Sequence, residues 1–414
     1  MQKDVLHHSF KWTGAEMLKK AGLSLLFLLS VFANVVNAAE PIKLGAVVPL
    51  KDVAGKESAN AMKLAVKEIN QAGGVLGRPL ELIVIDDEMN PGKGAAAIDK
   101  LATEDKVDIF VGGLSSGVHL AQIPVLKKYN KITVWSGAAS ARCEGALKDQ
   151  DWYFHLHPWD YQQTASYFEG WRAIGEKYPN VKLQKWFIAY EDGTFGTMTF
   201  KAHVELLPQG WVHQGADFRS ATAQGGGDYH GALRRAKEVK PDVFVWVGHE
   251  ADAIALTNQA KEMAFYPPVF IGSPPSWPTD FGKSPLSENI SLYGLWSPAM
   301  NSANKASRRF SEAYKKEFGE DASTYLAPLS YSNIQIVAKG IGKAGSLDSK
   351  TLIAALEQTK YESPLGDTIT FKPSKIIKHQ GLDKQKILQW QKGVQQVIWP
   401  FELATAKFVF PYKP

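Results

Sequence analysis

The sequence predicts an α/β protein with two Rossmann-like lobes. Short apolar segments rich in β-branched residues alternate with amphipathic segments of helical periodicity, first over residues 42–157 and again over residues 185–273. Parallel sheets covered by helices on both faces have this pattern, because each of their strands is buried on both sides. The C-terminal end reads as an antiparallel strand pair that follows three predicted helices. The chain should therefore return to a sheet already built, and we expect three crossings between the lobes.

The first block is divided into elements by glycine pairs and hydroxyl residues. Gly73-Gly74 ends the first amphipathic segment, and Gly112-Gly113 ends a short apolar run rich in β-branched residues. The expected strands are residues 42–50, 80–88, 107–111, 132–135 and an extended piece from 153, and the expected helices are residues 58–71, 92–103 and a helix that begins near Ser115 or Ser116.

The second block repeats the alternation of strands and helices, and this alternation becomes irregular after Pro278. Its expected strands are residues 185–192, 211–218, 242–249 and 267–273, and its expected helices begin near residue 161 and span 195–207, 228–239 and 251–263. An extended segment at 290–296 and helices at 304–318, 327–344 and 349–358 follow, and residues 365–371 and 386–400 form the final antiparallel pair. We expect one lobe to contain residues 39–157 plus 298–361, and the other to contain residues 158–297 plus 362–414.

The first 38 residues have the composition of a cleaved secretory signal peptide. Four lysines precede a short apolar stretch at residues 23–36, and Val36-Asn37-Ala38 places small residues where a signal peptidase cleaves. An uncleaved anchor is the alternative, but the apolar stretch is short for a membrane span. The sole cysteine, Cys143, is far from the cleavage site, so we expect a periplasmic protein without a lipid anchor.

Charge and motifs argue against several classes of function. Removal of residues 1–38 takes away four lysines and two acidic residues, which leaves 43 basic and 40 acidic residues and a net charge of +3. A charge this small, without a run of Lys or Arg, gives no reason to expect a nucleic-acid partner. The glycine-rich stretches lack the lysine and hydroxyl of a phosphate loop, and no G-x-S-x-G elbow is present. We therefore expect neither an enzyme nor a bound cofactor.

The stretch from Val107 to Ser140 contains the candidate binding site. Two consecutive predicted strands end in small residues and hydroxyls, the first before Ser115 and Ser116 and the second in Ser136-Gly137-Ala138-Ala139-Ser140. A helix N-terminus presents free N–H groups and a partial positive charge, and ligands of open α/β sheets bind beyond the carboxyl ends of the strands. These residues suit a carboxylate, although an ordinary cap and turn would have the same sequence.

Two clusters of possible metal ligands are less convincing. His155 and His157 would share one face of a strand, but two imidazoles are fewer than the three or four protein ligands of a zinc site. Asp86-Asp87-Glu88 stands at a strand end before a turn, where acidic residues commonly cap or remain solvated. We expect no metal.

Eight segments, in order, resemble type I periplasmic solute-binding proteins of the branched-chain amino acid (Leu/Ile/Val-binding) group, the capture subunits of ABC importers. The resemblance covers the chain after residue 38 and is carried by IKLGAVVPL, LAVKEINQAGGVLGRPLELIVIDDEMNP, VGGLSSG, SGAAS, HPWDYQQ, YEDGTFG, GHEADA and SYSNIQIVAKGI. It implies two lobes that close about a hinge over a small ligand.

The resemblance also implies roles for individual residues. The ligand carboxylate would lie against Ser115 or Ser116 and the turn Ala138, Ala139 and Ser140. Phe195 matches the family aromatic that packs on the ligand, and the position after the third strand of the second lobe falls at His249-Glu250.

One segment departs from the pattern of amino acid binders. These proteins usually carry an acid after the next strand, where it holds the ligand ammonium group, but here the segment reads GSPPSW, residues 272–277. Glu250 or Asp52 would have to replace that acid, or the ligand lacks an ammonium group. Trp277, like Phe195, would suit an aromatic or aliphatic ligand body.

We therefore expect a solute-binding component of an ABC importer, which captures a hydrophobic amino acid or a related aromatic or aliphatic acid. Its expected partners are the ligand and the membrane permease and ATPase subunits, and we expect a monomer. The alternative is a sensor of the same fold that presents solute to a membrane receptor or regulator.

Overall fold

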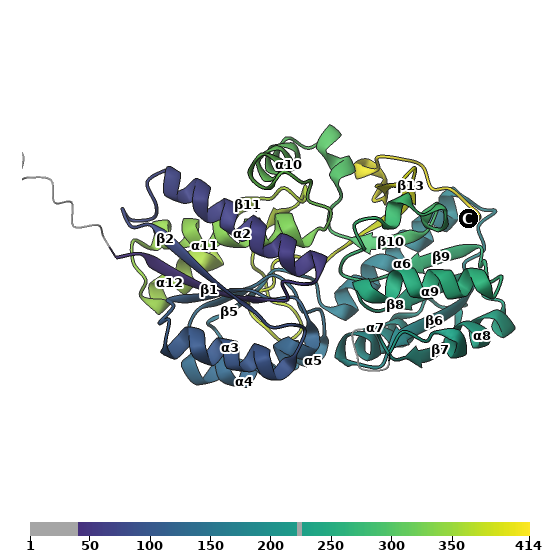
Figure 1. The fold of residues 1–414 in the computed structure, drawn as a ribbon, viewed down its shortest axis with the longest axis horizontal. Helices are drawn as coiled ribbons and strands as arrows, with labels where there is room; N and C mark the ends of the chain where they lie inside the picture. Colours follow the sequence, from purple (N-terminus) through teal and green to yellow (C-terminus); the bar gives the residue numbers. More distant parts are fainter. Residues whose placement is uncertain (1–39, 222–225) are drawn as a thin grey trace, which may run out of the picture. The chain divides into compact units, whose positions relative to one another are not determined.

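Two separate sheets organise residues Pro41–Pro414, which form one compact unit (Figure 1). The structure is a computed structural model and describes residues 40–221 and 226–414. The predicted signal peptide, residues 1–38, lies outside the described residues.

The first sheet is parallel throughout, with strand order β2-β1-β3-β4-β5. Its strands are β1 (Ile42–Val48), β2 (Leu80–Asp86), β3 (Ile109–Gly112), β4 (Thr133–Trp135) and β5 (Tyr153–His155). The helices packed around it are α2 (Val53–Gln71), α3 (Pro91–Thr103), α4 (Ser116–Tyr129), α5 (Ala141–Ala146), α11 (Leu326–Ala344) and α12 (Ser349–Glu357), and α10 (Lys305–Phe318) contacts α2. We call this sheet and these helices the first lobe.

Helices cover both faces of the first sheet. The pair α2 and α11 lies on one face, and the pair α3 and α4 lies on the other (Figure 1). In β1, Leu44, Ala46 and Val48 pack toward α2 and α11, while Val47 joins the cluster of α3 and α4. The two-residue period of a strand thus supplies apolar side chains to both faces.

The second sheet has the order β14-β13-β10-β9-β8-β6-β7. Its strands are β6 (Lys185–Glu191), β7 (Val212–Phe218), β8 (Val243–Val247), β9 (Val269–Gly272), β10 (Ser291–Gly294), β13 (Lys386–Gln391) and β14 (Val394–Trp399). β13 pairs antiparallel with both β10 and β14, whereas the strands from β7 to β10 are parallel. The helices of this second lobe are α6 (Asp160–Lys177), α7 (Thr194–Leu206), α8 (His230–Val239) and α9 (Glu250–Glu262).

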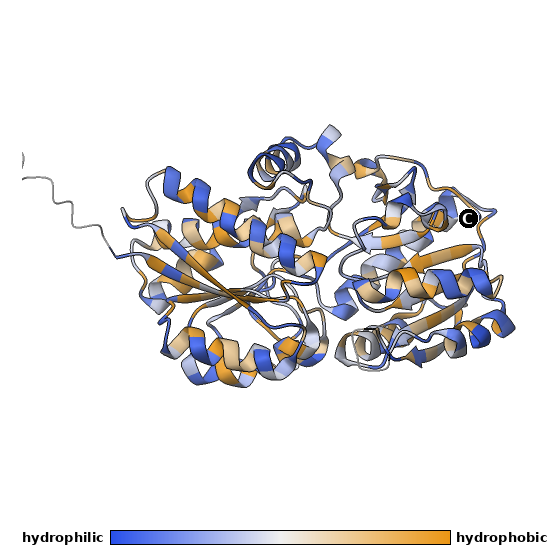
Figure 2. Cartoon of the chain, viewed as in Figure 1, coloured by the Kyte–Doolittle hydropathy of each residue, from blue (hydrophilic) through white to orange (hydrophobic). Residues whose placement is uncertain are grey.

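The central strand β8 is buried on both sides. Val243, Val245 and Val247 belong to the apolar cluster of α6, while Phe244 and Trp246 face the cluster that includes residues of α8 and α9. Figure 2 shows most strands of both sheets as hydrophobic, with hydrophilic residues gathered on the helices. The α/β class and the two lobes predicted from the sequence are confirmed.

The chain passes between the two sheets three times. It leaves β5 through α6, returns from β10 to the helices α10 to α12, and passes a last time from a segment beside β5 to β13. In that segment Gln380 bridges to His155, and the Gly381 N–H donates to the His155 carbonyl (2.7 Å). Residues 371–382 are bonded to the first lobe. We therefore propose that the second segment of the first lobe ends at about residue 383 and not at residue 361.

Three local predictions were wrong. The helix expected at 58–71 begins at Val53, because the Asp52 carboxylate accepts the Ala54 and Gly55 N–H groups (2.8 and 3.3 Å) and caps it. The short helix α5 was not predicted. Residues 365–371 do not pair with residues 386–400: β12 (Thr368–Ile369) pairs with β11 (Tyr361–Glu362), and β13 pairs with β14.

Candidate ligand-binding site

The carboxyl ends of β3 and β4 are hydrogen-bonded neighbours. The Ser136 N–H donates to the Gly112 carbonyl (2.7 Å), and the Ala138 N–H donates to the Leu114 carbonyl (2.8 Å). A Cβ added to Gly137 would lie 2.7 Å from the Gly113 carbonyl oxygen. The small residues predicted at this place therefore allow two backbone turns to pack directly on each other.

Ser115 and Ser116 begin α4 beside these turns. Ser115 is the N-cap, and its Oγ accepts the Val118 N–H (3.4 Å). Ser116 is 3% exposed, and its Oγ accepts the Ser140 N–H (3.2 Å). Since a hydroxyl has one proton and two acceptor positions, Ser116 keeps its O–H available as a donor. The helix N-terminus adds about 0.3–1 kcal/mol for a nearby anion.

Three other helix N-termini near this region receive carboxylates of the protein itself. Asp160 accepts the Ala141 N–H at the start of α5 (3.0 Å), and Glu191 accepts the Gly196 N–H at the start of α7 (2.6 Å). Asp252 accepts the His249 N–H at the start of α9 (2.7 Å). At α4 the cap is the neutral Ser115, so this N-terminus suits an external anion.

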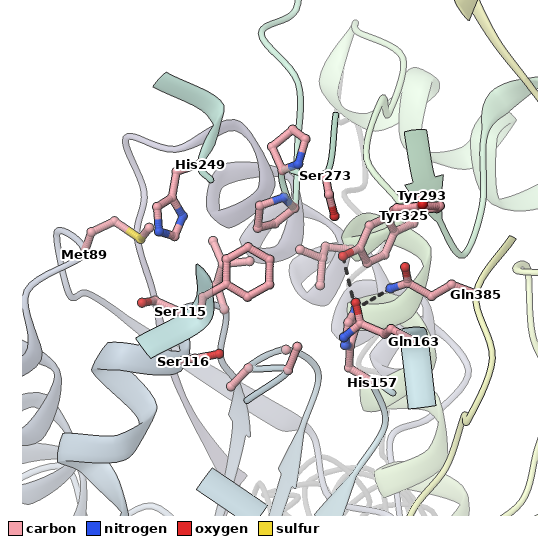
Figure 3. A pocket seen from close by; sticks show the side chains of 18 of the residues that line it. Met89, Ser115, Ser116, His157, Gln163, His249, Ser273, Tyr293, Tyr325 and Gln385 are labelled. Atoms are coloured by element: carbon pink, nitrogen blue, oxygen red, sulfur yellow. Dashed lines mark hydrogen bonds between the residues drawn. The ribbon is translucent and has the colours of Figure 1, made fainter. Parts of the chain in front are cut away.

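The second lobe contributes an aromatic and proline-rich wall. Phe195, the second residue of α7, and His249, the N-cap of α9, have ring centroids 5.9 Å apart. Ser273, Pro274 and Pro275 follow β9 and complete this wall. Figure 3 shows His249 on the same side of the pocket as Met89 and Ser115.

The opposite side of the pocket is a neutral hydrogen-bond network, which we call the distal network: His157, Gln163, Tyr167, Tyr325 and Gln385 (Figure 3). His157 Nε2 lies 3.1 Å from both the Tyr325 hydroxyl and Gln385 Nε2. The Tyr167 hydroxyl contacts the amide oxygens of both Gln163 and Gln385, the former at 2.8 Å. Tyr167 also stacks on Tyr293 with ring centroids 3.4 Å apart.

Burial keeps the distal network uncharged at neutral pH. Desolvation lowers the pKa of His157 to about 4 and raises the pKa values of Tyr167 and Tyr325. His157 Nδ1 lies 2.8 Å from the Pro158 carbonyl, which can only accept, so Nδ1 carries the proton and Nε2 is an acceptor.

These walls enclose one pocket lined by residues of both lobes. It has hydroxyl and helix N–H donors at one side, an apolar middle that includes Leu114, Phe195 and Leu326, and polar but neutral groups at the other side. Such a site can bind a small molecule with an anionic head and an apolar body.

Comparison with known proteins gives the family. The sequence profile described as "Periplasmic binding protein" matches residues 41–395. The chain belongs to the periplasmic binding protein family. It is a solute-binding protein, and its family consists of binding proteins rather than enzymes.

Individual relatives of this periplasmic binding protein are distant but span nearly its whole length. The Leu/Ile/Val-binding protein homolog 7 of Brucella abortus is 21% identical over 401 residues, covering 94% of this chain and 99% of the relative. A branched-chain amino acid transporter substrate binding protein of Streptococcus pneumoniae, solved with isoleucine, has a TM-score of 0.71, 20% identity and coverage of 90% and 100%. A solute binding protein of Rhodopseudomonas palustris BisB5, solved with 3,4-dihydroxybenzoic acid, has a TM-score of 0.70, 21% identity and coverage of 86% and 95%.

Six of the ten residues singled out from the sequence line the pocket of the periplasmic binding protein. They come from four different places in the chain and are Ser115, Ser116, Ala138, Ala139, Phe195 and His249. The turn after β4 and the N-terminus of α4 form one side, while Phe195 and His249 approach from the second lobe.

Four of the residues singled out lie outside the pocket lining. Ser140 is fully buried behind Ser116 and caps α5, where its Oγ accepts the Arg142 N–H (3.3 Å). Trp277 packs in the core of the second lobe, with its ring 4.5 Å from that of Phe281, because the missing side chain of Gly272 leaves room for it. Asp52 and Glu250 form hydrogen bonds with other protein groups at the contact between the lobes.

Asp52 and Glu250 join the two lobes beside the pocket. Glu250 Oε2 accepts the Val53 N–H (2.8 Å), and Asp52 Oδ1 accepts from the Ser276 hydroxyl (3.5 Å). Burial raises the pKa of Asp52, and burial together with the charge of Asp52 raises that of Glu250 to about 7. We propose that these carboxyl groups serve contact between the lobes and do not bind an ammonium group.

The distal network was missed from the sequence. Its members stand at 157, 163, 167, 325 and 385, so only two of them fall within one quoted motif, HPWDYQQ. Polar side chains near the start of α6 and before β13 lie at two crossings between the lobes, where they meet Tyr325 from the start of α11 in the first lobe. Recognising that crossings line the pocket is the signal that would have found them.

No alternative chemistry is apparent in the described part of the chain. Within residues 40–221 and 226–414, no group of three or more His, Cys, Asp and Glu side chains is placed to hold a metal ion. In the same residues, no helix combines the length and the apolar character needed to cross a membrane.

Proposed function

We propose that this periplasmic binding protein captures a small carboxylate-bearing solute and presents it to the permease and ATPase subunits of an ABC importer. The observation that carries the proposal is the pocket itself, which is lined both by the N-terminus of α4 with its neutral Ser115 cap and by an aromatic wall from the other lobe. The proposed carboxylate contacts are Ser115, Ser116 and the backbone at Ala138 and Ala139. Phe195 and His249 cover the ligand from the second lobe.

The proposed place of action is the periplasm. Residues 1–38 have the sequence of a signal peptide with small residues before the cleavage point, and Cys143 is too distant to carry a lipid there. We further propose that the mature protein is a monomer. Mass spectrometry of the exported protein, expected to begin at residue 39 or 40 without added lipid, tests cleavage and anchoring together.

The ligand class follows from what the relatives have in common. Relatives solved with isoleucine and with 3,4-dihydroxybenzoic acid share a carboxylate on an apolar body, but only isoleucine has an ammonium group. The pocket supplies donors for the carboxylate and apolar surface for the body. This supports a carboxylate ligand and leaves its second polar group as a separate question.

The test is solute binding by isothermal titration calorimetry with a panel of aliphatic and aromatic carboxylates and amino acids. The Ser116→Ala variant removes the free hydroxyl donor, and hydrogen bonds to charged groups contribute about 1.5–3 kcal/mol. We expect the Kd of every carboxylate ligand to rise about tenfold or more.

A matched control variant is Ser349→Ala. Ser349 is also the first residue of a helix, α12, but it is exposed and lies outside the pocket lining. The Ser349→Ala variant should bind each carboxylate with the affinity of the wild type. Equal affinities for Ser116→Ala and wild type would refute the carboxylate position, and the absence of binding by all carboxylates would refute the ligand class.

A further inference from the structure

Two contacts of the distal network are shared between competing partners. His157 Nε2 has a single lone pair, yet both the Tyr325 hydroxyl and Gln385 Nε2 lie 3.1 Å from it. The Tyr167 hydroxyl has a single proton, yet it contacts both the Gln163 and Gln385 amide oxygens. Tyr325 and Gln385 also bond to each other, and an amide has two N–H groups and two acceptor positions. The network that lines the pocket therefore offers both donors and acceptors to a neutral ligand group.

The orientation of Gln385 is fixed by its neighbours. His157 Nδ1 is the protonated nitrogen because it lies 2.8 Å from the Pro158 carbonyl, so Nε2 needs a donor facing it. The amide nitrogen of Gln385 must then point to His157 and its oxygen to Tyr167. Gln163 is held in turn by its Nε2 donating to the Pro158 carbonyl (2.8 Å). The donors and acceptors of the network are thus assigned by its geometry.

The pocket lining also lacks a carboxylate that could pair with a ligand ammonium group. None of the nineteen described residues that line it is Asp, Glu, Lys or Arg. Three acids of nearby elements are bonded to protein groups: Glu250 with Val53, Glu191 with the start of α7, and Asp160 with the start of α5. The ligand carboxylate has the N-terminus of α4, but a second charge at the distal network would have no ionised partner and would carry a large desolvation penalty.

We propose that the distal network selects a solute that has an uncharged hydroxyl or carboxamide group opposite its carboxylate and no ammonium group. A hydroxyl or a carboxamide both donates and accepts, so it bonds to both kinds of group in the network. Tyr325 and Gln385 are the specificity-determining residues, and His157 positions them. The inference rests on the proposed function, because the carboxylate at α4 sets which end of the solute reaches the network.

Most of the network members are buried as well as polar. His157, Gln163, Tyr167 and Gln385 are each at most 5% exposed, whereas Tyr325 is partly exposed. Tyr167 stacks on Tyr293, whose hydroxyl accepts the Trp171 indole N–H (2.9 Å). A site built to hydrogen-bond a polar group discriminates strongly against an analogue without it, because the buried polar groups are then left unpaired.

The experiment measures the Kd values of benzoate, 3-hydroxybenzoate, 4-hydroxybenzoate, 4-carbamoylbenzoate, terephthalate, 4-(aminomethyl)benzoate and leucine by calorimetry. At least one hydroxy or carbamoyl compound should bind tenfold or more tightly than benzoate. Terephthalate, 4-(aminomethyl)benzoate and leucine should bind more weakly than benzoate, since each brings a second charge.

Two variants assign the preference to the network. Gln385→Met keeps the side-chain length and removes the amide, and Tyr325→Phe removes only a hydroxyl. In either variant the tenfold preference should fall below about threefold. Gln358→Met, at an exposed position after α12, is the control and should keep the full preference.

The outcomes separate the two proposals. If no carboxylate binds, the proposed function fails. If carboxylates bind but benzoate equals its hydroxy and carbamoyl derivatives, or leucine binds most tightly, the distal inference fails and the carboxylate site stands. A preference that survives in a folded Gln385→Met or Tyr325→Phe protein also overturns the assignment, and thermal unfolding of the free variants establishes that they are folded.

Discussion

Cys143 lies directly behind the N-terminus of α4, where its thiol donates to the Ser116 carbonyl (3.4 Å). It is fully buried, and burial raises its pKa to about 12. Because the thiolate is the reactive form, a buried thiol of this kind is chemically inert. Cys143 therefore supports the position of Ser116 by packing.

We expect Cys143 in the native protein to resist iodoacetamide at pH 8 and to react completely in denaturant. Mass spectrometry of the alkylated fraction over time measures this. A bound carboxylate should slow native-state labelling further, since a ligand that binds the folded state reduces unfolding. Rapid labelling of the native protein would contradict the burial of this thiol.

Ser273 belongs to the segment GSPPSW, residues 272–277, in which the resemblance to amino acid binders would place an acid. It is 8% exposed, follows β9 and lines the pocket. We expect Ser273→Asp to improve the affinity for leucine relative to wild type and to weaken the affinity for benzoate, because the new carboxylate pairs with an ammonium group and repels a simple acid. Paired titrations with the two compounds measure the change, and a variant with unchanged selectivity would show that the position does not face the ligand.

At the scale of the element, the turn from β3 to α4 depends on glycine. Gly113 has φ +90°, and a Cβ added there would lie 1.9 Å from Nε1 of Trp135. Trp135 is fully buried in β4, so its indole cannot easily move aside. The close approach of the two strand ends, which forms the proposed anion site, therefore requires this glycine.

We expect Gly113→Ala to lower the free energy of unfolding by about 3 kcal/mol, from backbone strain together with overpacking. Gly117→Ala is the control in the same segment: it is helical, and its Cβ would meet only Ser115 Oγ at 3.8 Å. That substitution should be neutral or slightly stabilising. Urea unfolding measures the free energy of unfolding of both variants. Equal values for Gly113→Ala and Gly117→Ala would refute the role of Gly113.

At the scale of the whole molecule, Glu250 connects α9 of the second lobe to Val53 at the start of α2 in the first (2.8 Å). The Asp52 carboxyl group lies across this contact from Glu250. His249, the residue before Glu250, faces Asp52. With a pKa of about 7 in the folded state and 4.5 as its usual value, Glu250 stays protonated in the folded protein where the unfolded chain is ionised. Its contribution to stability is thus present below about pH 4.5 and is lost as the pH rises through about 7.

We expect Glu250→Gln to keep the acceptor for the Val53 N–H and to remove this titration. Its melting temperature should match the wild type near pH 4.5 and exceed it at pH 8. Glu238→Gln, at an exposed position on α8, is the control and should follow the wild type at both values. Thermal unfolding across pH 4.5–8 measures the difference, and parallel curves for Glu250→Gln and wild type would exclude the effect.

The amino-acid sequence by itself determined the elements and their class. Apolar runs such as β8 and glycine pairs such as Gly112-Gly113 act locally, so strand and helix order, the two lobes and the small-residue turns at Ser115–Ser116 and Ala138–Ala139 were predictable. Local patterns predicted the wrong start for α2, because the Asp52 side chain caps this helix. That hydrogen bond depends on one side-chain rotamer and leaves no periodic signal in the sequence.

Only the tertiary structure decided which polar side chains face the pocket. Residues 157, 167, 325 and 385 are distant in the chain and meet where the lobes are connected, whereas Trp277, which looked like a ligand contact, packs over Gly272 in the core. The physical reason is that strand and helix patterns depend on neighbours a few residues away. The orientation of a side chain at a crossing instead depends on the packing of both lobes around it.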